Sequence, residues 1–257
     1  MSKQFVVYHT EKGEGSGGGL SNHIDRVPGK EHTYKNADPK LKHLNKNFSP
    51  PGYENLSIPQ GIKKRIAEGY NGKRKIRSDA VKFLSHMFSG SNKQMMKIFS
   101  DEKTITHWLQ QTYNFAKEEF GKENIIKISL HLDERTPHLH ITSVPLTPDG
   151  RLSAREIMGD REKMKERQSK YAEMMKDLGL ERGISNTGIS RETAQDFSRR
   201  VQVADLEIEK LKVRKSDNSI DPVETLFKVT KALKLAKLDL LDPQREAKAK
   251  RDKGIGR

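Results

Sequence analysis

Three histidines lie within ten residues of one another in the stretch His131-Leu-Asp-Glu-Arg-Thr-Pro-His138-Leu-His140. Apolar residues alternate with polar ones on both sides of its centre, at Ile126, Ile128, Leu130, Leu139 and Ile141. Alternation with a period of two indicates a half-buried strand. The stretch therefore predicts two strands joined at 133–136. Their apolar residues should face one way and the three histidines the other.

Three imidazoles on one sheet face predict a metal site. Neutral imidazole is the commonest metal ligand in proteins, and three such ligands leave coordination positions open for a substrate. The cation keeps its full charge, so it can polarise a phosphodiester and stabilise the charge of the transition state. This ligand set suits Mn, Zn, Co or Ni better than Mg. We expect His131, His138 and His140 to hold one divalent ion, Mn first, with Mg, Co, Ni or Zn as alternatives.

The overall charge indicates the class of partner. The 257 residues carry a formal net charge of +14, which favours a polyanion: nucleic acid first, an anionic membrane surface second. The absence of cysteine excludes disulfides, thiolate zinc sites and cysteine nucleophiles, and fits a cytoplasmic protein. No apolar run is long enough for a signal peptide or a membrane span.

The remaining patterns predict an α+β fold. Strands are expected at 4–9 and 78–88, and helices at 101–120 and 161–178, with a capping box from Ser153 to Glu156. The glycine-rich stretch 13–19 is expected to be a mobile loop beside a site. Together these elements predict an antiparallel sheet of about five strands, with the three histidines on one face and helices covering the opposite, apolar face.

The chain is expected to divide near residue 200. Residues 1–200 are expected to form the domain that carries the three histidines, and residues 201–257 a helical, basic C-terminal extension. Amphipathic helices are predicted at 190–215 and 222–241, followed by a basic tail at 245–257. The extension is expected to pack on the main domain, to contact DNA or to mediate self-association, and the short tail indicates a fragment of a longer chain.

Seven basic residues between positions 63 and 77 form a basic belt, in which Glu68 is the only acid and Tyr70 an available stacking surface. Its residues are Lys63, Lys64, Arg65, Lys73, Arg74, Lys75 and Arg77. A solvated charged surface is one interpretation of the belt. The other is a strip that follows DNA phosphates, with the tyrosine available for base stacking.

The run HLDERTPHLH resembles the third motif of the MobV relaxases, the plasmid mobilisation (Mob/Pre) proteins of the HUH endonuclease superfamily. The segment His23-Ile-Asp-Arg26 is similar to the first motif of that family, although Ile24 stands where the family has Asn. The segment His43-Leu44-Asn45, with Asn47-Phe48, is similar to the second motif but lacks its tyrosine and acid. The resemblance covers roughly residues 5–200.

The resemblance implies a DNA-nicking and strand-transfer reaction at an origin of transfer. By this resemblance His131, His138 and His140 are the metal ligands and His23 is the nucleophile. Glu134 corresponds to the acid near that histidine and is expected to accept a hydrogen bond from one of its ring nitrogens, which leaves the lone pair of the other for attack on phosphate. Arg26 corresponds to a residue that meets phosphate or holds the loop. His43 and Asn45, as second-motif residues, are expected to contact DNA. Asp133 is expected to be a turn residue.

Alternatives remain open on the residues alone. Tyr8 and Tyr34 are rival nucleophiles, since most relaxases use tyrosine. The same three histidines would also suit a metal-dependent nuclease or phosphodiesterase that uses activated water. A third possibility is a non-catalytic DNA-binding or replication-initiation module. Only the relaxase predicts a covalent protein–DNA adduct.

Overall fold

The computed structural model describes residues 3–183 and 228–229. Five antiparallel strands form one sheet in the order β1-β3-β5-β4-β2. The strands are β1 (Val6–Lys12), β2 (Lys46–Asn47), β3 (Leu84–Gly90), β4 (Ile125–His131) and β5 (His138–Ser143). The helices are α1 (Gly18–Ile24), α2 (Ile58–Gly69), α3 (Asn92–Ile98), α4 (Glu102–Phe120), α5 (Ala154–Met158) and α6 (Arg161–Met174). The predicted α+β class with a five-stranded antiparallel sheet is confirmed.

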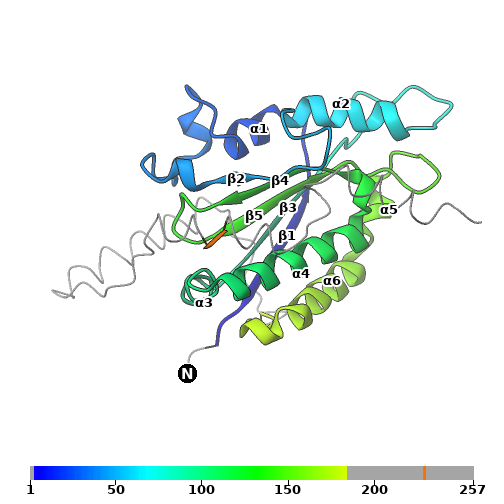
Figure 1. Ribbon diagram of the computed structural model, residues 1–257. Helices are drawn as coiled ribbons and strands as arrows, with labels where there is room; N and C mark the ends of the chain where they lie inside the picture. Colours follow the sequence, from blue (N-terminus) through cyan, green and yellow to red (C-terminus); the bar gives the residue numbers. More distant parts are fainter. Residues whose placement is uncertain (1–2, 184–227, 230–257) are drawn as a thin grey trace, which may run out of the picture.

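Helices lie on both faces of the sheet. In Figure 1, α4 and α6 lie below the sheet, with α3 at one end of α4, and α1 and α2 lie above it. The apolar face was expected to be covered by helices, and it is. The sequence analysis did not predict helices on the histidine face, but α1 and α2 cover part of it because they belong to an apolar cluster of their own, described below.

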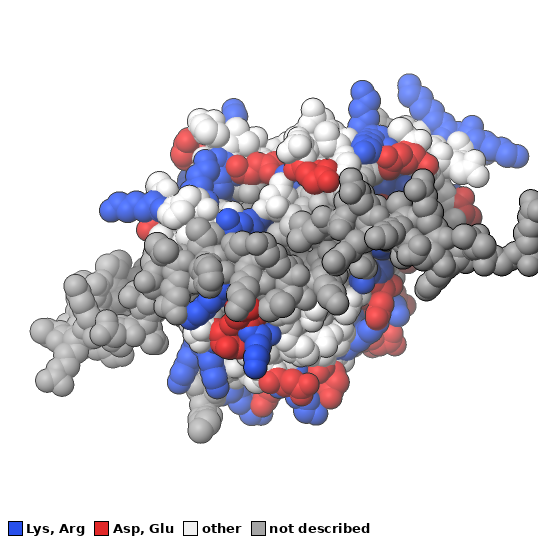
Figure 2. Space-filling model, viewed as in Figure 1, with Lys and Arg blue, Asp and Glu red and all other residues white. Residues whose placement is uncertain are grey.

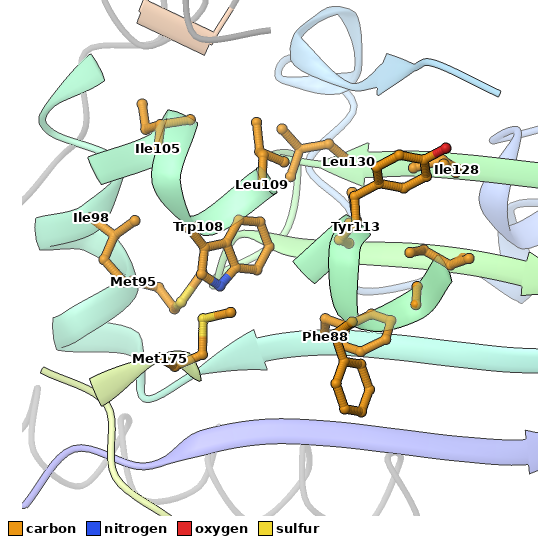
Figure 3. Close-up of a cluster of buried hydrophobic side chains, with 14 of the residues drawn as sticks. Phe88, Met95, Ile98, Ile105, Trp108, Leu109, Tyr113, Ile128, Leu130 and Met175 are labelled. Atoms are coloured by element: carbon orange, nitrogen blue, oxygen red, sulfur yellow. The ribbon is translucent and has the colours of Figure 1, made fainter. Parts of the chain in front are cut away.

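The larger core lies between the sheet and α4. Trp108, Phe115 and Phe120 of α4 are fully buried in this core together with Phe88 and Leu130 of the sheet. Figure 3 shows Trp108 between α4 and the sheet. Burying each such side chain contributes about 1.5–3 kcal/mol. Asp101 caps the start of the helix, and its carboxylate accepts a hydrogen bond from the backbone N–H of Thr104. Gly121 caps the end, with a φ of 84° that favours glycine.

A smaller core lies on the other face, beneath α1 and α2. Its buried residues are Ile24, Tyr53, Ile58, Ile62, Phe83, Ile126, Val144 and Leu146. The sequence pattern placed Ile126 on the same face as Ile128 and Leu130, which is wrong. The register of β4 against β5 shifts between Ile125 and Lys127. This bulge turns Ile126 toward α2, because one extra residue reverses the side to which later side chains point.

Two predicted boundaries also shift. The expected strand at 78–88 begins only at Leu84, because the pairing with both neighbouring strands ends there, at Lys12 and at Ser143. The glycine-rich stretch is a loop only in part, since α1 begins at Gly18. Gly17 has a φ of +79°, and a Cβ there would lie 2.9 Å from the side chain of Ile58, so the approach to α1 requires glycine.

Most of the expected C-terminal extension lies outside the described residues, as do the predicted helix at 190–215 and the basic tail. Within it, Lys228 and Val229 are described. Val229 is fully buried in the larger core, and Nζ of Lys228 donates to the carbonyl of Ser100 (2.8 Å). No helix within 3–183 has the length and apolar character needed to cross a membrane.

Candidate metal centre and nucleophile

The register of β4 and β5 brings the three histidines together. His131 lies directly opposite His138, and His140 lies opposite Ser129 on the same face. The ring centroids are 5.1 Å apart for His131 and His138, 4.8 Å for His131 and His140, and 4.9 Å for His138 and His140. The expectation that strand parity clusters these rings is confirmed.

The ring of His140 has the environment expected of a metal ligand. It is buried, and neither ring nitrogen has a hydrogen-bond partner within the described part of the chain. Burial lowers the pKa of His140 well below its usual value, and the neighbouring imidazoles lower it further. A neutral imidazole with two unsatisfied nitrogens is costly to bury, and a bound cation would satisfy one of them.

His138 presents one nitrogen to the same space. Its Nδ1 donates to the carbonyl of Thr136 (2.9 Å), which leaves the lone pair on Nε2. Such a bond from the distal nitrogen to a carbonyl is the usual way of orienting a metal-ligating histidine. Nε2 lies 3.8 Å from Oε1 of Glu134.

His131 is more constrained than the other two. Its Nδ1 lies 3.1 Å from Nη2 of Arg26, and its Nε2 lies 3.1 Å from the carbonyl oxygen of Ile24. Burial is the main reason why the pKa of His131 is strongly lowered, so the ring is neutral at ordinary pH. A neutral ring can ligate, although an ion at Nε2 would replace the contact with Ile24.

The donor atoms form two groups that share His131. The ligand atoms of His23, His131 and His140 lie within 4.8 Å of one another, and so do those of His131, Glu134 and His138. The three expected ligands are thus divided between the two groups, His140 in the first and His138 in the second. Imidazole and carboxylate donors at this spacing fit a divalent cation.

His23 lies in the last turn of α1, beside this cluster. Its ring centroid is 5.4 Å from that of His140 and 5.8 Å from that of His131. Its Nδ1 donates to the carbonyl of Thr33 (2.6 Å), so the lone pair is on Nε2. Burial lowers the pKa of His23 and outweighs the opposing effect of the Thr33 carbonyl. The ring is thus held neutral, in one tautomer.

Arg26, just after α1, joins that helix to the hairpin formed by β4 and β5. Its Nε and Nη2 donate to Oδ2 and Oδ1 of Asp133, both at 2.8 Å, and Nη1 donates to the carbonyl of His23 (2.8 Å). The side chains of Arg26 and Asp133 are 2% and 1% exposed. Arg26 has a φ of 49°, which is unusual for a residue other than glycine. A buried arginine with these partners holds the loop after α1 against the hairpin of β4 and β5.

The prediction that Asp133 is only a turn residue is wrong. Burial alone would raise its pKa, but the hydrogen bonds and charge of Arg26 outweigh this effect and hold the pKa below its usual value. Asp133 is therefore an anion that fixes Arg26. Nothing in the local sequence signals this role, because the partner is 107 residues away.

The expected role of Glu134 also needs correction. It was expected to accept a hydrogen bond from His23, and the Thr33 carbonyl fills that position instead. The carboxylate of Glu134 accepts a hydrogen bond from Nη2 of Arg26 (2.6 Å). Glu134 remains at the cluster, near Nε2 of His138.

A second ion pair attaches α1 to the sheet, and the sequence analysis did not identify it. Nζ of Lys127, in β4, lies 2.6 Å from Oδ1 of Asp25, and Oδ2 of Asp25 accepts from the hydroxyl of Ser21 (2.9 Å). The consecutive residues Asp25 and Arg26 thus both bind the hairpin of β4 and β5, at Lys127 before His131 and at Asp133 after it. The only sequence signal was a charged residue within an apolar strand.

The rival tyrosines point elsewhere. Tyr8 belongs to the larger core, on the opposite face of the sheet, where burial raises its pKa to about 12. The hydroxyl of Tyr34 donates to the carbonyl of Val27 (2.8 Å), and its ring lies 5.4 Å from the guanidinium of Arg26. Neither hydroxyl is directed at the histidine cluster.

The residues expected to bind DNA are distributed over several elements. Lys63, Lys64 and Arg65 are in α2, whereas Lys73, Arg74, Lys75 and Arg77 lie in the loop after it. His43 is exposed before β2. Asn45 accepts a hydrogen bond from the backbone N–H of Leu132 (2.8 Å), just after β4, and so contacts the hairpin that carries the three histidines.

The family model described as "Plasmid recombination enzyme" (Mob_Pre) matches residues 2–199. "Plasmid recombination enzyme type 1" of Staphylococcus aureus is 36% identical over 194 residues, covering 75% of this chain and 47% of the relative. "Plasmid recombination enzyme" of Streptococcus agalactiae is 34% identical over 196 residues, covering 76% and 38%. The chain thus spans half or less of the length of these relatives.

The fold is similar to that of a solved relaxase domain. The MobM relaxase domain (MOBV; Mob_Pre), in an Mn-bound crystal structure with plasmid pMV158 oriT DNA, superposes with a TM-score of 0.67. It is 32% identical, and the match covers 76% of this chain and 98% of that one. A second Mn-bound crystal structure of that domain with oriT DNA gives a TM-score of 0.66 at 31% identity.

Proposed function

Because this chain belongs to the Mob/Pre family of plasmid recombination enzymes, we propose that it is a metal-dependent DNA relaxase. It nicks one strand of DNA at an origin of transfer, keeps the 5′ phosphate covalently and later rejoins the strand, in the mobilisation of a plasmid or other mobile element. The observation that carries this proposal is the neutral, oriented ring of His23 beside three clustered imidazoles. The proposed place of action is the cytoplasm.

The metal would be held by His131, His138 and His140. The two unpartnered nitrogens of His140 and the available Nε2 of His138 support this ligand set. Manganese is the proposed ion, because the MobM relaxase domain that is similar to this chain is Mn-bound. When bound, the ion would supply positive charge that polarises the scissile phosphate.

His23 would be the nucleophile. Thr33 holds the proton on Nδ1, so the lone pair of Nε2 is available to attack phosphorus. A bond forms between Nε2 and phosphorus and the bond to the 3′ oxygen breaks. That oxygen takes up a proton from water and leaves as a 3′ hydroxyl. Attack of a 3′ hydroxyl on the phosphoramidate reverses the step and rejoins the strand.

Arg26 and Glu134 would act on the geometry of this reaction. Arg26 is buried and bound to Asp133 and Glu134, so we propose that it holds the His23 loop against the hairpin. Glu134, near Nε2 of His138, would complete the surroundings of the ion.

A second candidate is a water-using nuclease. The ligand atoms of His23 lie as close to His131 and His140 as a ligand would, so His23 could be a fourth ligand in place of the nucleophile. Water would then attack the phosphate and no adduct would form.

The test is adduct formation. The protein is incubated with Mn²⁺ and either pMV158 oriT single strands or a random single-stranded pool, and denaturing gels are used to detect protein-bound DNA. The relaxase predicts an adduct that is absent in His23→Ala, retained in Tyr34→Phe and in His107→Ala, and released by mild acid as a phosphoramidate. Cleavage without any adduct would establish the nuclease, and an acid-stable adduct would indicate a tyrosine.

A further inference from the structure

The segment 27–46, here named the lysine-rich segment, runs from the end of α1 to β2 and makes hydrogen bonds to three residues beside the histidine cluster, His23, Arg26 and Asp133. The carbonyl of Thr33 accepts from His23, and the backbone N–H of Asp38 donates to the carbonyl of Asp133 (2.7 Å). Nζ of Lys42 donates to the carbonyl of Arg26 (2.6 Å). A chain bound on this segment would therefore lie directly beside the proposed nucleophile.

The segment has a net positive charge. It contains five lysines, at positions 30, 35, 40, 42 and 46, and two carboxylates. Both carboxylates accept backbone hydrogen bonds within the segment: Glu31 from Gly29 (2.8 Å) and Asp38 from Lys40 (2.9 Å). Within the described ranges 3–183 and 228–229, none of the five lysines has a carboxylate partner within ion-pair distance. Lys30, Lys35, Lys40 and Lys42 are exposed.

The segment also offers exposed rings between these charges. His32 and His43 are both exposed. Flat rings among cations are typical of surfaces that bind single strands, because the bases stack on the rings while the cations follow the phosphates. A paired duplex keeps its bases in the helix, so it would use the lysines but not the rings.

The basic belt of α2 differs from the lysine-rich segment in both position and contacts. In Figure 1 the loop after α2 extends from the end of α2 that is farther from α1. Nζ of Lys64 donates to the carbonyl of Gly52, Arg65 donates to Oδ1 of Asn124, and Arg77 is paired with Asp79. Figure 2 shows Lys and Arg side chains gathered both over the region of α1 and at the far end of α2.

We infer that the lysine-rich segment is the surface that holds single-stranded DNA next to the scissile phosphate, with Lys30, Lys35 and Lys40 on phosphates and His32 and His43 against bases. The inference rests on the proposed function and specifies the surface that its substrate uses. The belt after α2 is then a secondary contact for DNA farther from the site.

The test compares two charge-matched variants, each with three cations replaced by glutamine. One is Lys30→Gln/Lys35→Gln/Lys40→Gln, and the other is Lys73→Gln/Arg74→Gln/Lys75→Gln. Binding of a fluorescein-labelled pMV158 oriT single strand is measured by anisotropy as a function of NaCl concentration. The first variant should lose at least about tenfold in affinity at moderate salt, and its salt slope should fall by about 2, or roughly 0.7 for each lost phosphate contact. The second should lose clearly less.

A ring variant tests the base contacts. His32→Ala/His43→Ala should weaken binding of the single strand by at least about tenfold but leave binding of a duplex of the same sequence unchanged, because only unpaired bases can stack on the rings. Circular dichroism of each variant checks that it folds. Equal losses in the two lysine variants, or a greater loss in the second, would overturn the inference.

The proposed function can fail separately. If the wild-type protein binds the strand through the lysine-rich segment but forms no adduct with Mn²⁺, the relaxase proposal fails and the surface assignment stands. If the wild-type protein forms the adduct and the first lysine variant binds normally, only the surface assignment fails. If the wild-type protein binds no single-stranded DNA, both fail.

Discussion

Arg26 and Asp133 are joined by two parallel hydrogen bonds of 2.8 Å, although they lie 107 positions apart in the sequence. Both side chains are almost completely buried. The pair fixes the loop after His23 to the hairpin that carries the clustered histidines. A second pair with the same fork geometry, Arg77 with Asp79, is on the surface, with side chains 81% and 64% exposed. The same substitution in the buried and in the exposed pair therefore measures the effect of burial on the stability of the fold.

Arg26→Met should destabilise the fold by about 3–5 kcal/mol, because removal of the guanidinium leaves Asp133 as an uncompensated buried charge. Arg77→Met should have a much smaller effect, since water and salt already screen its exposed pair. Urea denaturation measures both. Arg26→Lys, which retains the charge but loses the fork, should fall between them. Similar losses for the buried and the exposed pair would show that Arg26 does not fix the loop.

Lys127→Met should reduce nicking far more than it reduces metal binding. Lys127 holds Asp25, which is two residues from His23, whereas all three proposed metal ligands are on the hairpin. A shift of the His23 ring by about 1 Å would cost on the order of a hundredfold in turnover. Single-turnover adduct formation and Mn²⁺ titration measure the two effects. Lys127→Arg should restore part of the turnover, and a parallel loss of metal affinity would contradict this positioning role.

The histidine cluster could be predicted because strand parity is a local property. Alternation around His131 and His140 was enough to place them on one face, and the observed register pairs His131 with His138. The same rule failed at Ile126, five residues earlier, because a bulge interrupts the alternation and the sequence carries no signal for it.

Contacts between distant segments could not be predicted in the same way. Asp133 resembles an ordinary turn residue until Arg26 lies beside it, and the Thr33 carbonyl that orients His23 is a backbone group with no sequence signature. The positions of Lys127 and Asp25 likewise depend on how α1 packs on the sheet. Tertiary packing decides such roles, so a single sequence gives the ligands of the site more readily than their supports.

Stability should fall as the pH falls, in part because of His86. This ring is fully buried in β3, between Thr10 (2.9 Å) and Ser143 (2.8 Å), and it stacks on Phe120. Burial is the main reason why its pKa falls from 6.5 to about 3. The unfolded chain binds a proton as the pH drops below 6.5 while the folded chain does not, so unfolding becomes easier down to about pH 3.

The cost of this titration should reach a few kcal/mol at pH 3, at about 1.4 kcal/mol per unit of pKa difference. Urea denaturation at a series of pH values measures it. His86→Gln, which keeps hydrogen-bonding groups but does not titrate, should show a flatter dependence over this range. An unchanged slope in His86→Gln would show that other groups determine the acid sensitivity.

His140→Leu should separate metal binding from folding. The two ring nitrogens of His140 are buried without hydrogen-bond partners in the described chain, so an apolar replacement should stabilise the metal-free protein by about 1–3 kcal/mol. The same change removes a proposed ligand. In the wild-type protein, Mn²⁺ at a hundredfold excess over its Kd should add about 2.7 kcal/mol of stability, and in the variant this increment should disappear. Thermal unfolding with and without Mn²⁺ measures both effects. A variant that is less stable without metal, or that still responds to Mn²⁺ as the wild type does, would remove His140 from the ligand set, whereas His107→Leu should retain the full response.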